Sequence, residues 1–201
     1  MGKRLFDLLL AGCGLVVSAP LWAVLALAIK GEDGGPIFFR QERVGRGGRR
    51  FQALKFRSMR TDAEALTGPV QATADDPRVT RIGRWMRRTA MDELPQLWNI
   101  FRGDMSFVGP RALRPGEIEA ETDGRLVALE DVPGFEHRIR VRPGLTGLAQ
   151  VYARRDVPRR HKFRYDRIYV ERRSWTLDAR LILLSFWISF LGTWEARGRK
   201  Y

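Results

Sequence analysis

Two adjacent carboxylates, Asp92 and Glu93, are the residues of this sequence whose types and placing best suit chemistry. The apolar side chains after them follow the spacing i, i+3, i+4, i+7 of one helix face: Leu94, Leu97, Trp98 and Phe101. This spacing predicts a short amphipathic helix that ends near Gly103, with Asp92 at or near its N-cap and Pro95 in its first turn. A helix N-terminus stabilises an ionised carboxylate, and its free N–H groups can bind phosphate. We therefore expect carboxylate chemistry on a phosphate ester.

Arginines dominate the segment before the two acids. The sequence predicts a helix that starts at Asp76-Pro77 and carries an arginine stripe at i, i+3, i+7: Arg81, Arg84 and Arg88. Arg87 lies off this stripe, because consecutive residues are about 100° apart around a helix. For the dipeptide alone, a capping aspartate beside a first-turn glutamate is the simpler interpretation. A cation-rich helix leading into two acids instead suits a diphosphate and a divalent metal, since arginine binds phosphate bidentately and carboxylates hold Mg²⁺.

Several blocks of sequence, spread along nearly the whole chain, carry a family resemblance. They read KRLFD at 3–7, SAP at 18–20, KFRSM at 55–59, DELPQL at 92–97, GDMSFVGPR at 103–111 and VRPGLTGLAQV at 141–151. With these blocks in this order, the chain resembles the bacterial sugar transferases of the monotopic phosphoglycosyl transferase family, in its minimal form. It departs from the family pattern at Ala112, where a second proline is usual, and at residues 152–156, a loop that bears on the choice of sugar.

The resemblance implies an activity and its partners. A sugar 1-phosphate would move from a nucleoside diphosphate sugar, with uridine expected from family habit, to a polyprenol phosphate such as undecaprenyl phosphate. The nucleoside monophosphate would be released, through a covalent aspartyl-phosphosugar intermediate, in the first membrane step of glycoconjugate or exopolysaccharide assembly. The expected partners are therefore the nucleotide sugar, the polyprenol phosphate and anionic membrane lipid. A homodimer is compatible with this expectation, and nucleic acid is not expected.

The resemblance also implies roles for individual residues. Asp92 is the expected nucleophile and, with Glu93, the expected contact for a Mg²⁺ cofactor. Our choices for contacts to the substrate are Lys55, Arg87, Arg111, Arg142 and Thr146. For Lys55 the simpler alternative is a solvated strand edge. Lys3 and Arg4 are expected at the acceptor phosphate or at lipid headgroups.

Composition bounds the possibilities without reference to any family. The chain has 201 residues, of which 44% are hydrophobic, enough for one modest core and a membrane-associated segment. Its net charge of +13 indicates an anionic partner, and composition alone leaves nucleic acid, anionic lipid and a phosphorylated substrate open. The single cysteine, Cys13, excludes an intramolecular disulfide and suits a reducing compartment. His137 and His161 are too few for a histidine-rich zinc site.

The N-terminal segment bears on the membrane. Residues 8–29 include no charged side chain and, at about 1.5 Å per residue, are long enough to cross a hydrocarbon core of about 30 Å. A straight span is the default interpretation, and a signal peptide is another. Ser18 and Pro20 favour a sharp break, because proline removes a helical hydrogen bond and clashes with the preceding turn. Basic residues flank both sides, so no orientation of a single span is favoured. We predict a re-entrant broken helix with both ends on the cytoplasmic face, as the resemblance also implies.

Weaker patterns organise the rest of the chain. Residues 37–43 and 50–57 flank a glycine-rich turn at 45–48 and predict a β-hairpin, with Lys55 and Arg57 on one face of its second strand.

Three further segments have a distinct composition. Residues 61–75 are polar and predict a loop, and residues 117–130 are acidic and predict a solvated helix. Residues 181–194 are strongly apolar and include Trp187 and Trp194. An interfacial amphipathic helix and a core helix are equally compatible with that segment.

The predicted architecture is mainly α with a small β-hairpin, an α+β class. Residues 1–31 form the re-entrant anchor, and residues 32–201 form one catalytic domain, with interfacial amphipathic helices, on the cytoplasmic face of the bacterial inner membrane. Because a polyprenol phosphate presents its headgroup at the interface, the active site is expected at that depth. The alternative is a basic membrane-anchored nucleic-acid-binding protein or a scaffold without catalysis, and it leaves the segment around Asp92 unexplained.

Overall fold

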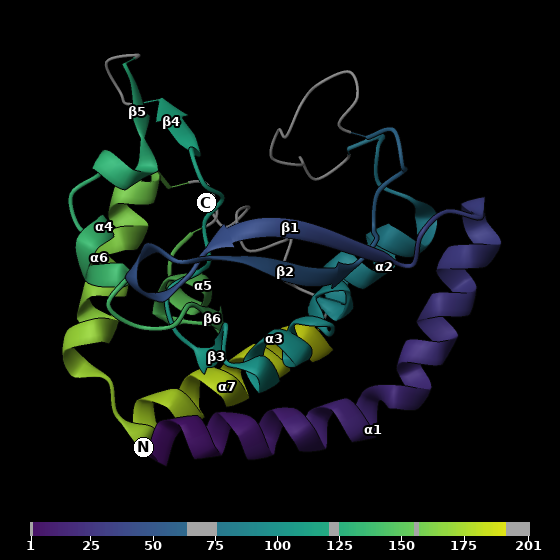
Figure 1. Cartoon of the computed structure of the whole chain (residues 1–201), viewed down its shortest axis with the longest axis horizontal. Helices are drawn as coiled ribbons and strands as arrows, with labels where there is room; N and C mark the ends of the chain where they lie inside the picture. The colour runs from purple at the N-terminus through teal and green to yellow at the C-terminus, as the bar shows by residue number, and fades with distance from the viewer. Residues whose placement is uncertain (1, 64–75, 121–124, 155–156, 192–201) are drawn as a thin grey trace.

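Helices predominate in the computed structural model of the chain, which describes residues 2–63, 76–120, 125–154 and 157–191 (Figure 1). In chain order the elements, with 3₁₀ turns written η, are α1 (Gly2–Asp33), β1 (Phe38–Val44), η1 (Arg46–Gly48), β2 (Arg50–Phe56), α2 (Arg81–Thr89), η2 (Met91–Glu93), α3 (Gln96–Arg102), β3 (Ser106–Val108), β4 (Ile118–Ala120), β5 (Leu126–Ala128), η3 (Leu129–Asp131), α4 (Phe135–Arg138), β6 (Gly144–Thr146), α5 (Leu148–Tyr152), α6 (Arg159–Arg172) and α7 (Trp175–Phe190). The α+β class is confirmed. Residues 64–75 of the predicted polar loop, residues 155 and 156, and Trp194 lie outside the described residues.

α1 is one long apolar helix that bends. Pro20 lies inside it, and the Ser18 hydroxyl donates to the Gly14 carbonyl oxygen at 2.6 Å, a back-bond of the kind that accompanies helix bending. In Figure 1 the helix runs along the bottom of the molecule and then turns upward at the right. It is long and apolar enough to cross a membrane, and 11% of its most apolar window is buried. The predicted helix-break-helix is thus a continuous bent helix, which passes residue 31 and ends at Asp33.

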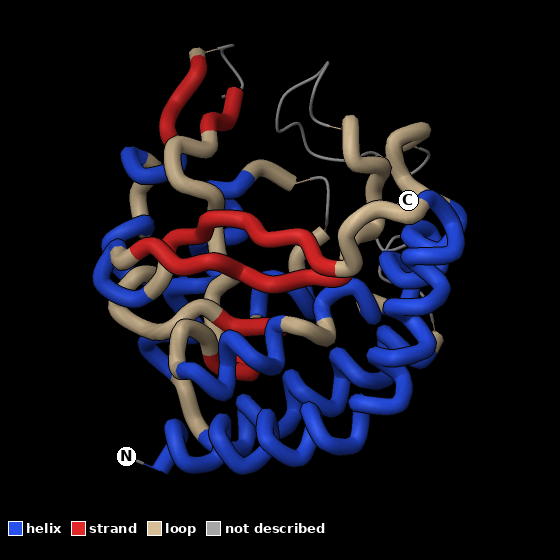
Figure 2. Tube along the Cα trace, turned by 45° about the vertical axis from the view of Figure 1, so that its right-hand side comes forward, coloured by secondary structure: helices blue, strands red, loops and turns tan. Residues whose placement is uncertain are grey.

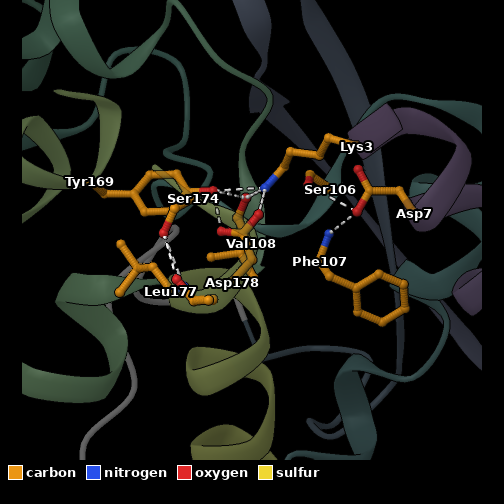
Figure 3. Close-up of polar contacts among 10 residues, drawn as sticks. Lys3, Asp7, Ser106, Phe107, Val108, Tyr169, Ser174, Leu177 and Asp178 are labelled. Carbon is orange, nitrogen blue, oxygen red and sulfur yellow. Dashed lines mark hydrogen bonds and ion pairs between the residues drawn. The ribbon is translucent and has the colours of Figure 1, made fainter. Parts of the chain in front are cut away.

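Polar contacts tie both ends of α1 to the same folded domain. Near the N-terminus, buried Asp7 accepts hydrogen bonds from the Ser106 hydroxyl and the Phe107 N–H, each at 3.1 Å (Figure 3). At the other end, the Arg57 guanidinium donates two hydrogen bonds to the Asp33 carboxylate, one of them at 2.6 Å. Both ends of α1 are thus fixed to one domain, and between them Ala11 and Leu25 are buried in its hydrophobic cores.

The predicted β-hairpin is confirmed. β1 and β2 pair antiparallel from Phe38↔Phe56 to Val44↔Arg50, and they cross the middle of the molecule above the layer that contains α1 (Figures 1 and 2). The buried Asn99 of α3 joins this hairpin to the helices. Its side-chain oxygen accepts from the Leu54 N–H at 2.9 Å, and its amide donates to the Gln52 carbonyl oxygen at 2.7 Å. These two bonds fix α3 against β2.

Two of the sequence blocks pair through β3 and β6. These strands are parallel, with Ser106 opposite Gly144 and Val108 opposite Thr146. A side chain at Gly109 or Gly144 would collide with the backbone of the other segment, so glycine permits the close approach. The blocks at 103–111 and 141–151 therefore act as one packed unit.

The acidic segment 117–130 is not the helix that its composition suggests. It forms the antiparallel strands β4 and β5 followed by η3. Its acids are not merely solvated, because the Glu119 carboxylate accepts from the Arg159 N–H at 2.8 and 2.9 Å, at the start of α6. Glu117 pairs with the Arg159 guanidinium at 2.8 Å. Binding the N-terminus of α6 satisfies these carboxylates better than a solvated helix would.

The arginine-rich helix begins later than predicted. Thr80 is the N-cap of α2, and its hydroxyl oxygen accepts from the Gly83 N–H at 2.9 Å. Asp76 is buried in the preceding turn, where its carboxylate accepts from the Arg78 N–H at 3.0 Å. The aspartate therefore caps a turn instead of the helix, because a suitable cap lies four residues further on.

An apolar surface covers one side of the molecule. α7 buries Leu181, Ile182 and Ile188 and exposes an opposite apolar face, so it has both a core side and an outward apolar side. The large exposed apolar side chains of α1, α3 and α7 are Leu5, Leu9, Val16, Val17, Val24, Leu27, Trp98, Phe101, Leu183, Phe186, Trp187 and Phe190. α3, α7 and the first half of α1 lie side by side along the bottom of Figure 1, and the second half of α1 turns upward at the right. Such an extended apolar surface is typical of a membrane contact.

A buried ion pair in the α4 and α6 region gives a stability prediction. Arg138 and Asp166 are both buried and lie 3.2 Å apart. The Asp166→Asn substitution leaves the guanidinium without a counter-charge, and we expect a loss of about 3–5 kcal/mol in the free energy of unfolding. The measurement is chemical denaturation of the detergent-solubilised chain. Glu171→Gln, in the exposed Arg167–Glu171 pair, is the control and should leave the midpoint unchanged. Equal effects of the two substitutions would contradict the role of burial.

The tied ends of α1 give a topology prediction. Two variants of a chain with Cys13→Ser test this: one has a cysteine in a short N-terminal extension, and the other has a cysteine in place of exposed Arg49. We expect neither cysteine to react with an impermeant thiol reagent in intact cells, and both to react after permeabilisation. Replacing Ser18 and Pro20 together by Ala and Leu removes a cost of about 3 kcal/mol to a straight helix and should move a fraction of N-termini across the membrane. Labelling of the wild-type extension alone from outside would exclude the re-entrant arrangement in favour of a single span.

Candidate active site

The two acids lie in η2, between α2 and α3, and not at the N-cap of α3. Ala90 is the one non-glycine residue of the described chain with a positive φ, 56°, and it turns the backbone from α2 into η2. Pro95 takes the N-cap position of α3. A left-handed alanine is strained, and such strain concentrates at functional sites. The turn directs Asp92 inward, where the residue is 9% exposed.

Lys55 of β2 lies between the two carboxylates. Its Nζ is 2.5 Å from Glu93 Oε1 and 4.0 Å from Asp92 Oδ2. Glu93 Oε1 also lies 3.5 Å from an Arg111 guanidinium nitrogen. Glu93 therefore neutralises the lysine and braces the arginine, whereas Asp92 keeps its carboxylate oxygens less engaged. The less engaged carboxylate is the better nucleophile of the pair.

The surroundings shift the pKa values of the two acids in opposite directions. Burial raises the pKa of Asp92 to about 6, and the charge of Glu93 adds to the rise, while Lys55 opposes it. Burial acts on Glu93 in the same sense, but the charges of Lys55 and Arg111 and the hydrogen bond from Lys55 outweigh it and lower the pKa of Glu93 to about 2. At pH 7 a carboxyl with a pKa of 6 is ionised in a ratio of about ten to one. Both acids are thus predominantly anionic near neutral pH.

Arg87 and Arg111 add positive charge around the pair. Arg87, half-buried in the last turn of α2, lowers the pKa of Asp92 more than Arg111 does, so the structure favours it over the exposed Arg88. Arg111 is 46% exposed at its side chain and forms the rim of the site.

Arg43 is the residue of the site that sequence reasoning missed. Its charge acts on Glu93, and its own pKa is lowered to about 10 by burial and by the nearby charge of Arg111. The strand pattern contained a signal for it. Arg43 and Phe39 lie on the same face of β1, and Phe39 pairs with Lys55, so Arg43 and Lys55 share one face of the hairpin.

The backbone around Arg111 is held from two sides. Arg138 donates to the Arg111 carbonyl oxygen at 2.6 Å, and Arg43 donates to the Ala112 carbonyl oxygen at 2.9 Å. Arg111 also forms an isolated bridge to Gly144. These contacts orient the segment without the proline that is usual in the family at position 112.

The structure does not bring every predicted residue to the carboxylate pair. Thr146 is buried, and its hydroxyl is hydrogen-bonded to the Ser185 hydroxyl of α7 and not to the carboxylate pair. Arg142 donates from Nε to the Gly103 carbonyl oxygen at 2.7 Å and lines a separate cavity. Both lie in segments adjacent to Arg111 in the fold, which explains why the blocks suggested a single site.

Lys3 and Arg4 fasten the start of α1. The Lys3 ammonium forms an ion pair with Asp178 and donates to the Tyr169 hydroxyl at 2.8 Å and to the Val108 carbonyl oxygen at 3.2 Å (Figure 3). Arg4 donates to the Ile100 and Phe101 carbonyl oxygens of α3 at 2.6 and 2.7 Å. Cations on the last carbonyls of a helix also favour its dipole.

The carboxylate pair fits a magnesium ion that substrate completes. Within the described residues, no group of three or more His, Cys, Asp or Glu side chains could hold a metal by itself. Mg²⁺ is commonly bound by one or two carboxylates together with substrate phosphates instead of an all-protein cage. Asp92 and Glu93, surrounded by phosphate-binding cations, match that donor set.

Comparisons with known proteins relate the chain to one family along most of its length. The family described as bacterial sugar transferase matches residues 1–192. The chain is 43% identical over 190 residues to an undecaprenyl-phosphate glucose phosphotransferase of Komagataeibacter xylinus. The matched region covers 91% of this chain and 35% of that protein. It is 42% identical over 185 residues to the exopolysaccharide production protein PSS of Rhizobium leguminosarum bv. phaseoli, 90% of each chain.

A third relative, like the first, matches this chain over only part of its own length. The UDP-glucose:undecaprenyl-phosphate glucose-1-phosphate transferase of Xanthomonas campestris pv. campestris is 40% identical over 190 residues, 92% of this chain and 38% of that protein. The chain therefore spans little more than a third of the Komagataeibacter and Xanthomonas relatives and nearly all of the Rhizobium one.

The opposing pKa shifts can be tested directly. In the protein labelled with ¹³C at aspartate carboxyls, we expect the Asp92 signal to titrate near pH 6. Lys55→Met removes a charge that lowers this pKa and should move the titration to higher pH. Glu93→Gln removes a charge that raises it and should move the titration to lower pH. Arg164→Gln, on the exposed side of α6, is the control without a shift. Shifts of the same sign in both site variants would contradict the electrostatic assignment.

Proposed function

This chain belongs to the bacterial sugar transferase family, and from that membership and the buried carboxylate pair we propose that it is a phosphoglycosyl transferase. In this proposal it transfers a sugar 1-phosphate from a nucleoside diphosphate sugar to a polyprenol phosphate. The observation that carries the proposal is the unequal engagement of Asp92 and Glu93 by Lys55. One buried carboxylate is held by cations while its neighbour stays available for attack.

The first half-reaction is a displacement at phosphorus. A carboxylate oxygen of Asp92 attacks the sugar-bearing phosphorus and forms a new P–O bond. The bond from that phosphorus to the oxygen bridging the two phosphates breaks, and the nucleoside monophosphate leaves with the bridging oxygen. The sugar phosphate is then joined to Asp92 as a mixed anhydride, and no external oxidant or reductant is involved.

The cations of the site match the charges of that step. Lys55 and Arg111 lie within 4.0 Å of the acids, and the charge of Arg87 also acts on Asp92, so incoming phosphate oxygens would meet positive charge on several sides. Glu93 holds the Lys55 ammonium in position through their ion pair. A Mg²⁺ ion held by Asp92 and Glu93 would supply further charge neutralisation for the phosphates.

The second half-reaction regenerates the enzyme. A phosphate oxygen of the polyprenol phosphate attacks the phosphorus of the aspartyl-phosphosugar, the bond to Asp92 breaks, and the carboxylate is restored. The product is a polyprenol diphosphate sugar. The names of the relatives support undecaprenyl phosphate as the acceptor and a UDP-sugar as the donor.

The apolar surface supports a membrane-bound arrangement for this chemistry. α1 is tied to one domain at both ends, through Asp7 and Asp33, which favours a re-entrant helix with the domain on the cytoplasmic side. The exposed apolar residues of α3 and α7 would then lie in the interface. A polyprenol phosphate can present its headgroup to Asp92 only at that depth.

The covalent step can be tested without the acceptor. Incubation with the correct nucleotide sugar and Mg²⁺ should add the mass of one phosphosugar to the intact protein, and Asp92→Asn should reduce adduct formation by a factor on the order of 10⁴ or more. A panel of nucleotide sugars, read by intact-protein mass and by monophosphate release, identifies the donor. Asp104→Asn is the matched control, because Asp104 follows α3 and contacts Asn99 at 3.3 Å. An undiminished adduct in Asp92→Asn would assign the nucleophile to another residue.

A further inference from the structure

A cavity of about 260 Å³ lies beside the start of α1, away from the carboxylate pair. Its wall comes from segments far apart in the sequence: α1, the hairpin turn, β3, the segment between α4 and β6, and the end of α6. Its cationic residues are Lys3, Arg4, Arg46, Arg140, Arg142 and Arg173. In the described part of the chain, Asp7 is the one acidic residue of the wall.

The positive charge of this wall is largely uncompensated. Lys3 is neutralised by Asp178, and the Asp7 carboxylate already accepts bonds from Ser106 and the Phe107 N–H. Arg4 and Arg142 donate to neutral backbone carbonyls.

The remaining cations have still fewer partners. Within the residues that the structure covers, no hydrogen bond or ion pair joins the side chains of Arg46, Arg140 and Arg173 to another group. Burial and the nearby charges of Arg4 and Arg46 lower the pKa of Arg142, which shows the electrostatic cost of this crowding. An anion in the cavity would offset that cost.

The cavity and the carboxylate pair are separate sites. The wall contains none of Lys55, Asp92, Glu93 and Arg111. Arg46 follows the turn end of β1, whereas Lys55 pairs with Phe39 near the open end of the hairpin. With about 3.3 Å per residue along a strand, the backbones at those two ends are roughly 15–20 Å apart. A group bound in the cavity is therefore not the phosphate that reacts at Asp92.

The surroundings of the cavity place it at headgroup depth. Lys3 and Arg4 are followed along α1 by the exposed Leu5 and Leu9. Trp175, which is 55% exposed, stands two residues beyond Arg173 and packs edge-on against Phe6, with ring centroids 5.6 Å apart. Basic side chains over tryptophan and leucine are typical of the boundary between lipid headgroups and hydrocarbon.

We propose that this cavity is a second phosphate-binding site, distinct from the catalytic one. Guanidinium groups bind phosphate oxygens in pairs, and several face one small volume here. The phosphate can come from the headgroup of an anionic phospholipid or from a soluble phosphate ester. In either case binding joins α1, the hairpin turn and α6 through one anion.

The test compares two double variants of the full-length chain in detergent. Arg46→Gln with Arg140→Gln removes two cavity charges that have no protein partner. Arg40→Gln with Arg164→Gln removes two exposed charges elsewhere, and Arg40 pairs with Leu54 on the strand face opposite Lys55. Native mass spectrometry measures retention of phosphatidylglycerol, with phosphatidylcholine as the zwitterionic comparison and glycerol 1-phosphate as the soluble competitor.

We expect wild-type protein to retain phosphatidylglycerol over phosphatidylcholine, and the cavity variant to bind it at least about tenfold more weakly, while the control pair stays within about twofold. Displacement by glycerol 1-phosphate would identify the phosphate itself as sufficient, and failure to displace would identify the lipid as the ligand. Equal losses in both double variants would overturn the proposal, as would a wild-type protein that neither prefers phosphatidylglycerol nor binds glycerol 1-phosphate. Asp92→Asn should bind like the wild type, so this outcome is independent of the catalytic assignment.

Discussion

Polar contacts at its two ends and apolar packing along its inward face hold α1 to the protein, with Ala11, Leu25 and Ile29 buried in its hydrophobic cores. Leu9, Val17 and Leu27 are 60%, 80% and 75% exposed and face away from the folded domain. In water such exposure is unfavourable by about 25 cal/mol for each Å² of apolar surface, whereas in hydrocarbon the penalty disappears. Hydrocarbon therefore suits the outward face of the helix, while its inward face packs on the domain and Asp7 and Asp33 fix its ends.

This attachment is transmitted to η2, the turn that carries Asp92 and Glu93. The Glu32 carboxylate, next to Asp33, accepts hydrogen bonds from the Arg81 and Ile82 N–H groups in the first turn of α2, at 2.6 and 3.1 Å. α2 then ends at the strained Ala90, which directs Asp92 inward. On the opposite side, Asn99 fixes α3 to the strand that carries Lys55. The depth of α1 and the position of the carboxylate pair are thus set by one continuous series of contacts.

Charged side chains crowd together at both the carboxylate pair and the cavity beside α1, and each group of like charges needs opposite charge nearby. At the carboxylate pair, both acids are largely shielded from solvent, but Lys55 lies closer to Glu93 than to Asp92. The negative charge of Glu93 is therefore better neutralised than that of Asp92. At the cavity, the arginines outnumber the acidic groups, and the imbalance is offset only by an added anion. The two sites thus concentrate part of the positive charge of the chain, one around a carboxylate pair and the other around a cavity with a single acidic residue in its wall.

The sequence by itself determined the apolar anchor, the β-hairpin, and the identity of Asp92, Glu93 and Lys55 as neighbours in a family pattern, because hydrophobic spacing, glycine turns and short motifs are local. The predicted start of α2 and the predicted helix at 117–130 were wrong, and Asp92 lies in η2 instead of capping α3. Competing caps and the partner Arg159 are visible only in the fold. Tertiary structure alone decided that Arg43 lies near the carboxylate pair, while Thr146 packs against Ser185 and Arg142 lines another cavity. The direction in which a long side chain points depends on which strands and helices meet around it, and the pairing of β3 with β6 is not encoded in either segment alone.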